Sequence, residues 1–356
     1  PGTEEVTGGL ISAILEEAGK IAEDLLSPIN QSGDQEGCQF SDGVVSTPKG
    51  FKEAYSTFTE GGWSGLTGDV NYGGQGMPKM LSALVEEMIF AANSSFALYP
   101  ILNTGAALTL SQHGSAELKQ QYLPKMYSGS WSGTMCLTEP HAGTDLGMIK
   151  TKAVVSAEGN YQLTGTKIFI TAGEHDLTEN IIHLVLAKLP DAPAGPRGIS
   201  LFLVPKFLVD ETGELSGERN GVSCGSIEHK MGIKASATCV MNFDSAVGYL
   251  VGELNQGLSH MFTMMNDERL SMGLQGNGLA DSSYQIASAY AKERVQGRAA
   301  AGPQSLDQNA DPILVHPDVR RMLLTMKANV LAGRALSLYV ASQLDISRFH
   351  PEEASR

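Results

Sequence analysis

The hydrophobic period of the chain changes twice, and this limits the possible folds more than any other feature of the sequence. Up to about residue 127, stretches such as "LISAILEEAGKIAEDLLSPI" and "MPKMLSALVEEMIFAANSSFALYP" repeat apolar residues every three or four positions, which is typical of helices. From about residue 131 to 250, short β-branched runs such as "TGTKIFIT" and "GISLFLVP" alternate with turn residues. This pattern indicates an antiparallel sheet folded into a barrel or sandwich. The helical period then returns.

This order predicts an α+β protein of three parts. We expect an N-terminal all-α domain over residues 1–130, a central β-barrel-like domain over 131–250 and a C-terminal helical bundle over 251–356. The last part contains two long amphipathic helical stretches, whereas a closed bundle usually takes four helices. We therefore expect the bundle to be incomplete in this chain and to be finished by further residues of the polypeptide or by another subunit.

Charge and cysteine content exclude several classes of function. The net charge is -14 and the basic residues are scattered, which argues against a protein that binds nucleic acid. The four cysteines, at positions 38, 136, 224 and 239, form no CxxC pair and no cluster with zinc spacing, so we expect no metal site and a reducing cytoplasm. No uninterrupted apolar run approaches the roughly 18–20 residues of a membrane span.

Two segments of the β region carry groups that could hold a flavin or nucleotide. The loop "MCLTEPHAGTDLG" (135–147) combines hydroxyls from Thr138 and Thr144 with exposed amides near Gly143, which suits phosphate oxygens and ring edges. The strand in "LTGTKIFITAG" ends with Phe169 and Thr171, which should face the same side, so that a ring and a hydroxyl could meet one planar ligand. The alternatives are a Pro/Gly surface loop and a buried strand end.

Six stretches give the chain a resemblance to a known family. In order, they are "YGGQGMP", "HGSAELKQQYLPKMYSGSWSGTMCLTEPHAGTDLG", "YQLTGTKIFITAG", "GISLFLVPK", "KMGIKAS" and "AYAKERVQGR". Together they resemble the acyl-CoA dehydrogenases, flavoproteins that oxidise the Cα–Cβ bond of acyl-CoA thioesters. The segments "LFLVPK" and "MNDERLSMGLQG" are most similar to the large branch of this family that includes 3-methylmercaptopropionyl-CoA dehydrogenase.

The resemblance implies a set of FAD contacts. From the β region they are Met135, Leu137, Thr138, Gly143, Thr144, Phe169 and Thr171. Thr144 would meet the pyrophosphate and Thr171 would lie near flavin N5, while Phe169 stands where relatives usually have tryptophan. Arg294 matches an arginine that reaches the FAD pyrophosphate of a neighbouring subunit, and a guanidinium suits that anion.

The reaction of the family needs a base that removes the α-proton of the thioester. In most relatives the base is a glutamate in a late "YEGT"-like motif, which does not occur in these 356 residues. Some relatives carry it on the first long helix of the last domain, where this chain has Glu268; the alternative is a solvated pair with Arg269. Arg269 matches a CoA-contacting arginine or forms a structural salt bridge. Asn266 replaces a common aspartate at a second CoA contact.

The resemblance thus implies FAD-dependent dehydrogenation of an acyl-CoA to the trans-2-enoyl-CoA in fatty acid metabolism. Electrons would pass to electron-transfer flavoprotein, and the protein would be a homo-oligomer, a dimer or tetramer. Two alternatives stay open: an acyl-CoA oxidase of the same architecture, and a flavin-binding relative that has lost dehydrogenation.

Overall fold

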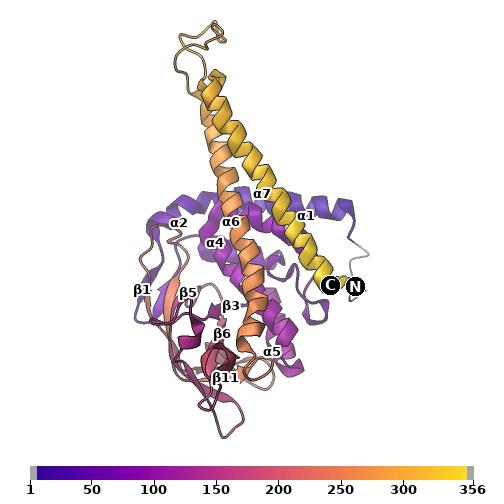
Figure 1. Cartoon of the computed structure of the whole chain (residues 1–356), viewed down its shortest axis with the longest axis vertical. Coiled ribbons are helices and arrows are strands. Elements are labelled where there is room, and N and C mark those ends of the chain that lie inside the picture. Colours follow the sequence, from indigo (N-terminus) through magenta and orange to yellow (C-terminus); the bar gives the residue numbers. More distant parts are fainter. Residues whose placement is uncertain (1–5, 351–356) are drawn as a thin grey trace.

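The computed structural model describes residues 6–350 and confirms the predicted sequence of helical, β and helical parts (Figure 1). The ends of the first and third predicted parts, residues 1–5 and 351–356, lie outside the described residues. In the view of Figure 1 the first helices and the sheet form a body, from which a long helical hairpin projects.

The first part is a layer of helices around one long central helix. Its elements are α1 (Gly8–Lys20), α2 (Asn30–Glu36), the hairpin β1 (Gln39–Ser41) and β2 (Val44–Ser46), α3 (Phe51–Glu60), α4 (Lys79–His113) and α5 (Ala116–Ser128). The backbone of α4 leaves helical geometry at Asn93, whose side-chain oxygen accepts a hydrogen bond from Phe96 N and starts the second half of the helix. Most side chains of that second half are buried.

We expected no segment long and apolar enough to cross a membrane, but α4 meets both criteria. Among the described helices, α4 alone reaches the necessary length and apolarity, because it continues through polar positions such as Asn103. However, 78% of the most apolar 18-residue stretch of α4 is buried inside the protein, which is typical of the core helix of a folded domain.

The second part is a sheet of seven strands that closes on itself. The strands are β3 (Trp131–Cys136), β4 (Lys152–Val155), β5 (Tyr161–Thr171), β6 (Asn180–Lys188), β7 (Ile199–Pro205), β10 (Val222–Ile227) and β11 (Thr238–Leu250), with a small separate pair β8 (Phe207–Val209) and β9 (Leu215–Arg219). Strands β11, β5, β4, β6 and β7 pair in a ring, because β7 contacts both β6 and β11. The sheet is therefore barrel-like, as predicted.

One part of the strand prediction was wrong. The sheet is mixed, since β3 runs parallel to β6 and β4 meets β6 in a parallel pair, whereas the sequence suggested an antiparallel sheet. The antiparallel β4–β5 hairpin lies between β3 and β6 in the chain. After this hairpin, β6 pairs with β3 and runs parallel to it.

The third part consists of α6 (Gly257–Glu293) and α7 (Pro317–Phe349), which form the projecting hairpin. The first turn of α6 lies close to β7: a Cβ added to Gly257 would be 2.2 Å from the backbone carbon of Ser200. At its other end, α7 reaches the start of α4, where the Asp345 carboxylate accepts hydrogen bonds from Lys79 N and Met80 N. The site described below lies where α6, α4 and β3 meet.

Candidate functional site

The loop after β3 folds back tightly and then presents an exposed tip. Glu139 and Ala142 exchange two backbone hydrogen bonds, of 2.9 and 3.0 Å, which close the turn. Gly143 and Thr144 follow on the surface, and a Cβ at Gly143 would have no atom within 4 Å. Among the described residues, no group bonds the hydroxyl of Thr144. The tip therefore has the open amides and free hydroxyl that an anionic group requires.

The end of β5 lies beside this loop. Ile168 N donates a hydrogen bond of 2.9 Å to Thr138 O, which ties the two segments together. The next residue, Phe169, has a φ of 60° and is 58% exposed. A left-handed conformation is costly for an aromatic residue, and it holds this ring against solvent rather than in the core. The expected buried strand end is thus excluded.

The hydroxyls of Thr138 and Thr171 are available to a ligand. Both side chains are half-buried, and neither hydroxyl has a hydrogen-bond partner within residues 6–350. Met135 and Leu137 are also half-buried and pack against the apolar core that includes Met261. The structure thus ties the loop after β3 to the end of β5; Gly143, Thr144 and Phe169 are exposed, and the other predicted residues of the β region are half-buried.

A buried ion pair that the sequence analysis missed fixes this arrangement. Lys167 Nζ donates hydrogen bonds of 2.9 Å to Leu137 O and to Glu139 Oε1, and the Lys167 side chain is fully buried. The Glu139 carboxylate also accepts from the amides of Lys150 and Thr151. Burial opposes ionisation of Glu139, but Lys167 and the amide donors outweigh it, so the pKa of Glu139 is lowered. No sequence signal marks a lysine of an amphipathic strand as inward-facing.

The candidate base, Glu268, is a buried carboxyl without a hydrogen-bond partner. It is 8% exposed, and its Oε1 lies against α4, where a Cβ on Gly105 would be only 2.9 Å away. Burial, and next the negative charges of Asp267 and Glu86, raise the pKa of Glu268 to about 8. The expected alternative of a solvated pair with Arg269 does not hold for this carboxyl.

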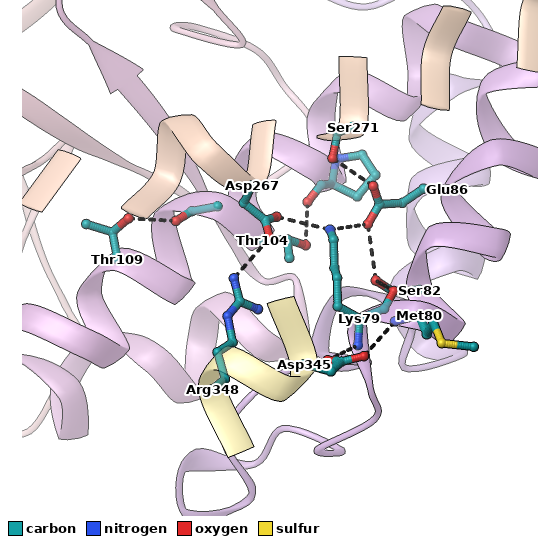
Figure 2. A network of polar contacts seen from close by, with 12 residues as sticks. Lys79, Met80, Ser82, Glu86, Thr104, Thr109, Asp267, Ser271, Asp345 and Arg348 are labelled. Carbon is teal, nitrogen blue, oxygen red and sulfur yellow. Dashed lines mark hydrogen bonds and ion pairs between the residues drawn. The ribbon is translucent and has the colours of Figure 1, made fainter. Parts of the chain in front are cut away.

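Its acidic neighbours are all paired (Figure 2). Lys79 Nζ lies between Glu86 Oε1, at 2.8 Å, and Asp267 Oδ2, at 3.1 Å, and both pairs are buried. Arg348 of α7 reaches Asp267 at 3.3 Å, and Ser271 Oγ donates to Glu86 at 2.7 Å. The local cations are therefore committed to other carboxylates, and Glu268 is left to titrate within an apolar and acidic environment.

The two predicted CoA-contacting residues lie on a different side of α6. Arg269 Nη1 donates to Asn266 Oδ1 at 2.8 Å, and the guanidinium lies 5.3 Å from the centre of the Phe262 ring. Both Asn266 and Arg269 are exposed, and Arg269 has no carboxylate partner within the described chain. An exposed guanidinium without a counter-ion can bind a ligand phosphate, so the salt-bridge alternative is not supported.

Glu268 and the strand that leads into the loop rest on adjacent residues of α4. Gly105 lies under Glu268, and Ala106 lies under β3, where a Cβ on Gly133 would be 2.4 Å from Ala106 Cβ. Met264, one turn before Glu268, belongs to the same buried cluster as Ala106. The carboxyl and strand β3 therefore both pack against the same segment of α4.

A small cavity of about 40 Å³ lies along the two halves of α4. Its lining is mostly apolar and includes Phe58, Trp63, Val85, Ile89 and Ile101, with Glu86 and Thr104 as polar members. Its lining residue Thr104 precedes Gly105, the residue of α4 that lies under Glu268.

Arg294 does not join these residues within one chain. It ends α6 at the far tip of the projecting hairpin, where its carbonyl accepts a hydrogen bond from Ile313 N, and its side chain is exposed (Figure 1). This position permits contact with another molecule, as the prediction of a contact across subunits requires.

Models of three domains from one protein family match the chain in order. They are described as the N-terminal domain of acyl-CoA dehydrogenase over residues 11–130, the middle domain over 134–246 and the C-terminal domain over 255–355. The matches follow the helical, β and helical parts of the structure.

Individual relatives agree with this result. The chain is 49% identical over 342 residues to 3-methylmercaptopropionyl-CoA dehydrogenase of Ruegeria pomeroyi, covering 96% of this chain and 58% of that protein. It is 41% identical over 358 residues to a butyryl-CoA dehydrogenase of Syntrophomonas wolfei, covering 97% and 58%. The chain thus spans less than two thirds of the length of these relatives.

A solved structure shows the same fold. The crystal structure of an acyl-CoA dehydrogenase complexed with FAD from Bacillus anthracis superposes with a TM-score of 0.78 at 26% identity, covering 99% of this chain and 55% of that one. All three helical and β parts are therefore shared with a protein whose title names its bound cofactor.

Proposed function

Because the chain belongs to the acyl-CoA dehydrogenase family, we propose that it binds FAD and oxidises the Cα–Cβ bond of an acyl-CoA thioester to the trans-2-enoyl-CoA. The observation that carries the proposal is the position of Glu268. A buried carboxyl with no partner lies over Gly105 of α4, and the next residue, Ala106, lies under β3, the strand that leads into the loop with the free hydroxyls.

The residues present fit FAD. The unbonded hydroxyls of Thr138 and Thr171 would bond the edge of the isoalloxazine, against which Met135, Leu137 and Phe169 offer apolar surface. The open loop tip would meet the pyrophosphate through Gly143 and Thr144, and the exposed guanidinium of Arg294 would do so from a second subunit. Bound FAD would supply the acceptor for the hydride that leaves Cβ.

The proposed task of Glu268 is to take the proton from Cα. A carboxylate in water is too weak a base for the α-proton of a thioester, whereas burial makes the same group more basic. The pKa of Glu268 is raised to about 8, so this carboxylate is a stronger base than one in water. No cationic side chain is bound to its Oε1, so none has to be displaced before the carboxylate takes the proton. Only the ionised form accepts a proton, so kcat/KM should rise with pH as Glu268 loses its own proton.

The cavity along α4 suggests a short acyl chain. The cavity is small, about 40 Å³, and its lining is mostly apolar, so it would accept only a short apolar group. The relatives named after 3-methylmercaptopropionyl-CoA and butyryl-CoA are consistent with such a chain. Arg269 and Asn266 would contact the CoA part from the exposed side of α6.

The remaining parts of the proposal concern partners and location. The family supports electron-transfer flavoprotein as the electron acceptor and fatty acid metabolism as the context. We further propose a homo-oligomer, because Arg294 lies at the tip of a projecting hairpin. We also propose a location in the reducing cytoplasm, where the four free cysteines would stay reduced.

Anaerobic bleaching of the flavin tests the proposal. FAD-loaded protein mixed with butyryl-CoA should lose its yellow absorption, and Glu268→Gln should bleach at least about 100-fold more slowly, a typical effect of removing a general base. Glu293→Gln, an exposed residue of the same helix, is the control and should bleach at the rate of the original protein.

The outcomes separate the alternatives. Equal rates for Glu268→Gln and the control would remove Glu268 as the base. No bleaching by any acyl-CoA would favour a flavin-binding protein without dehydrogenation. Rapid peroxide formation after exposure to air would identify an oxidase.

A further inference from the structure

A larger cavity, of about 250 Å³, lies where β10 ends and β11 begins, and its lining residue Thr238 pairs with Thr171 of β5. We call it the Ser236 cavity. Its lining comes from three places in the chain: Cys38; Ile227, Glu228, His229 and Lys230; and Lys234, Ser236, Ala237 and Thr238. None of these residues belongs to the site described above, and none of the proposed FAD or acyl-CoA contacts lines the cavity.

The floor of the cavity carries an unusual polar group. Ser236 is 1% exposed, and its Oγ has no hydrogen-bond partner among the described residues. A buried hydroxyl that bonds nothing is costly, and native proteins rarely leave one without a bound water, ion or ligand. The orphan hydroxyl therefore suggests that the cavity is filled by a polar group.

A lysine stands beside this hydroxyl with one donor to spare. Lys230 Nζ donates to Ser236 O at 2.6 Å and to Thr238 Oγ1 at 2.9 Å, which uses two of its three N–H groups. Because the Thr238 oxygen accepts from Lys230, its own proton is available. Burial lowers the pKa of Lys230, so the ammonium group lacks a close counter-ion that would offset its desolvation.

The charges around the cavity favour an anion. Lys230 and Lys234 are cationic, and Glu228 is the one acidic residue of the lining. The nearby carboxylate of Asp34 already accepts a hydrogen bond from Lys234 N. His229 also lines the cavity and is exposed. A basic lining stands out in a chain with a net charge of -14.

We propose that the Ser236 cavity binds a phosphate group, held by the Lys230 ammonium and by the hydroxyls of Ser236 and Thr238. An ammonium and two hydroxyls that approach from different directions match a tetrahedral oxyanion better than a flat carboxylate. The volume exceeds that of phosphate alone, so the phosphate can be inorganic or the end of a small phosphomonoester. The proposal does not depend on the dehydrogenase activity.

Isothermal titration with inorganic phosphate tests the proposal directly. The protein is kept saturated with FAD, so that the pyrophosphate-binding loop is occupied, and ionic strength is held constant with chloride. We expect saturable binding of phosphate, with acetate at least about tenfold weaker. A parallel titration with glycerol 3-phosphate distinguishes the two sources: tighter binding than phosphate indicates a monoester, and weaker binding indicates the free ion.

Variants assign the binding to this cavity. Lys230→Met should weaken phosphate binding about tenfold or more, because it removes a charge-assisted donor. Ser236→Ala should weaken it several-fold while leaving the melting temperature unchanged or higher, since it removes an unpaired buried hydroxyl. Lys152→Met, an exposed lysine of β4, is the matched control and should bind normally.

Several results would overturn the assignment. These are no saturable binding at millimolar phosphate, equal affinity for acetate, or unchanged affinity in both Ser236→Ala and Lys230→Met. If Lys230→Met fails to fold, Lys230→Arg and Ser236→Ala carry the test: normal phosphate affinity in Ser236→Ala would then contradict it.

Discussion

One carboxyl group, that of Glu268, should make the stability of this protein depend on pH. Burial raises the pKa of this carboxyl in the folded state from its ordinary 4.5 to about 8, so the folded protein keeps a proton that the unfolded chain releases. The stability conferred by the neutral form is complete below about pH 4.5 and is lost as pH rises towards 8. Each pKa unit corresponds to about 1.4 kcal/mol, so the effect is on the order of a few kcal/mol.

Melting temperatures at pH 5 and pH 9 check this prediction. The original protein should lose more stability between these values than Glu268→Gln, which stays neutral throughout. Glu293→Gln should follow the original protein, because that carboxyl is exposed. An identical pH dependence in Glu268→Gln and the original protein would show that Glu268 is ionised normally.

The ring of Phe169 should serve a ligand rather than stability. Its backbone has a φ of 60°, a conformation that costs a non-glycine residue about 1–2 kcal/mol. Phe169→Gly relieves this cost and removes a ring that is 58% exposed. The FAD-free variant should therefore melt at the same or a higher temperature, while its affinity for FAD falls at least several-fold. Unchanged FAD affinity would mean that the ring does not contact the flavin.

The sequence indicates the candidate ligand-binding residues, but it does not indicate the buried residues that hold them in place. Hydroxyls and small residues in the β3–β4 loop are visible as a local pattern, but the left-handed backbone of Phe169 interrupts the strand alternation that was expected to place its ring on the side of Thr171. Lys167 could not be predicted to point inwards, because its partner Glu139 is distant in the chain and its burial depends on both segments being in place. The same holds for the lack of a partner at Glu268.

The loop after β3 and the end of β5 should depend on the Lys167–Glu139 pair. Lys167→Met leaves a buried carboxylate unpaired and should lower the free energy of unfolding by about 3–5 kcal/mol. The double variant Lys167→Met/Glu139→Gln should recover part of this loss, because no unpaired charge is left. Chemical denaturation measures both; a double variant less stable than Lys167→Met would contradict the pairing.

Helices α4 and α6 should pack backbone to backbone at Gly278. A Cβ there would lie 2.8 Å from Glu87 O and 3.0 Å from Ala91 N, so Gly278→Ala should destabilise the protein by about 1–3 kcal/mol. Gly276, two residues earlier in α6, has no atom within 4 Å of such a Cβ. Gly276→Ala should therefore stabilise by up to about 1 kcal/mol through helix propensity. Equal melting temperatures for the two variants would contradict the close approach.

The hydrophobic period of the sequence predicted the order of helices and strands, but it did not predict the kink in α4 or the direction in which the strands pair. The kink at Asn93 arises because its side chain caps the second half of α4, and the start of α4 is capped by Asp345 from the other end of the sequence. The parallel pairing of β3 with β6 likewise depends on the route of the chain through the β4–β5 hairpin. These contacts join distant parts of the sequence, which a periodic pattern does not record.

The projecting hairpin as a whole exposes apolar side chains that its own two helices do not cover. Ile286 is 69% exposed, Leu324 67% and Leu336 64%, and Arg294 lies at the tip of the same hairpin. Exposure of large apolar side chains along a helical hairpin is typical of a surface that is covered in the assembled protein. It supports the proposal of an oligomer in which one subunit completes the flavin site of another.

Mixed oligomers test that sharing. Arg294→Ala and Phe169→Gly should each weaken FAD binding when produced alone. Co-produced as a dimer, they should regain about one normal site in four, because half of the randomly paired dimers are mixed and each mixed dimer holds one intact site. If Arg294 acts on the flavin of its own subunit, the mixture regains none.

The central claim is that the loop after β3 and the end of β5 hold one flavin per chain. The most direct measurement is a titration of the FAD-free protein with FAD, followed by visible absorption. The account predicts a saturable shift of the flavin bands that ends at one FAD per chain and weakens in Phe169→Gly. A protein that stays colourless after FAD is added and the excess removed would contradict the account.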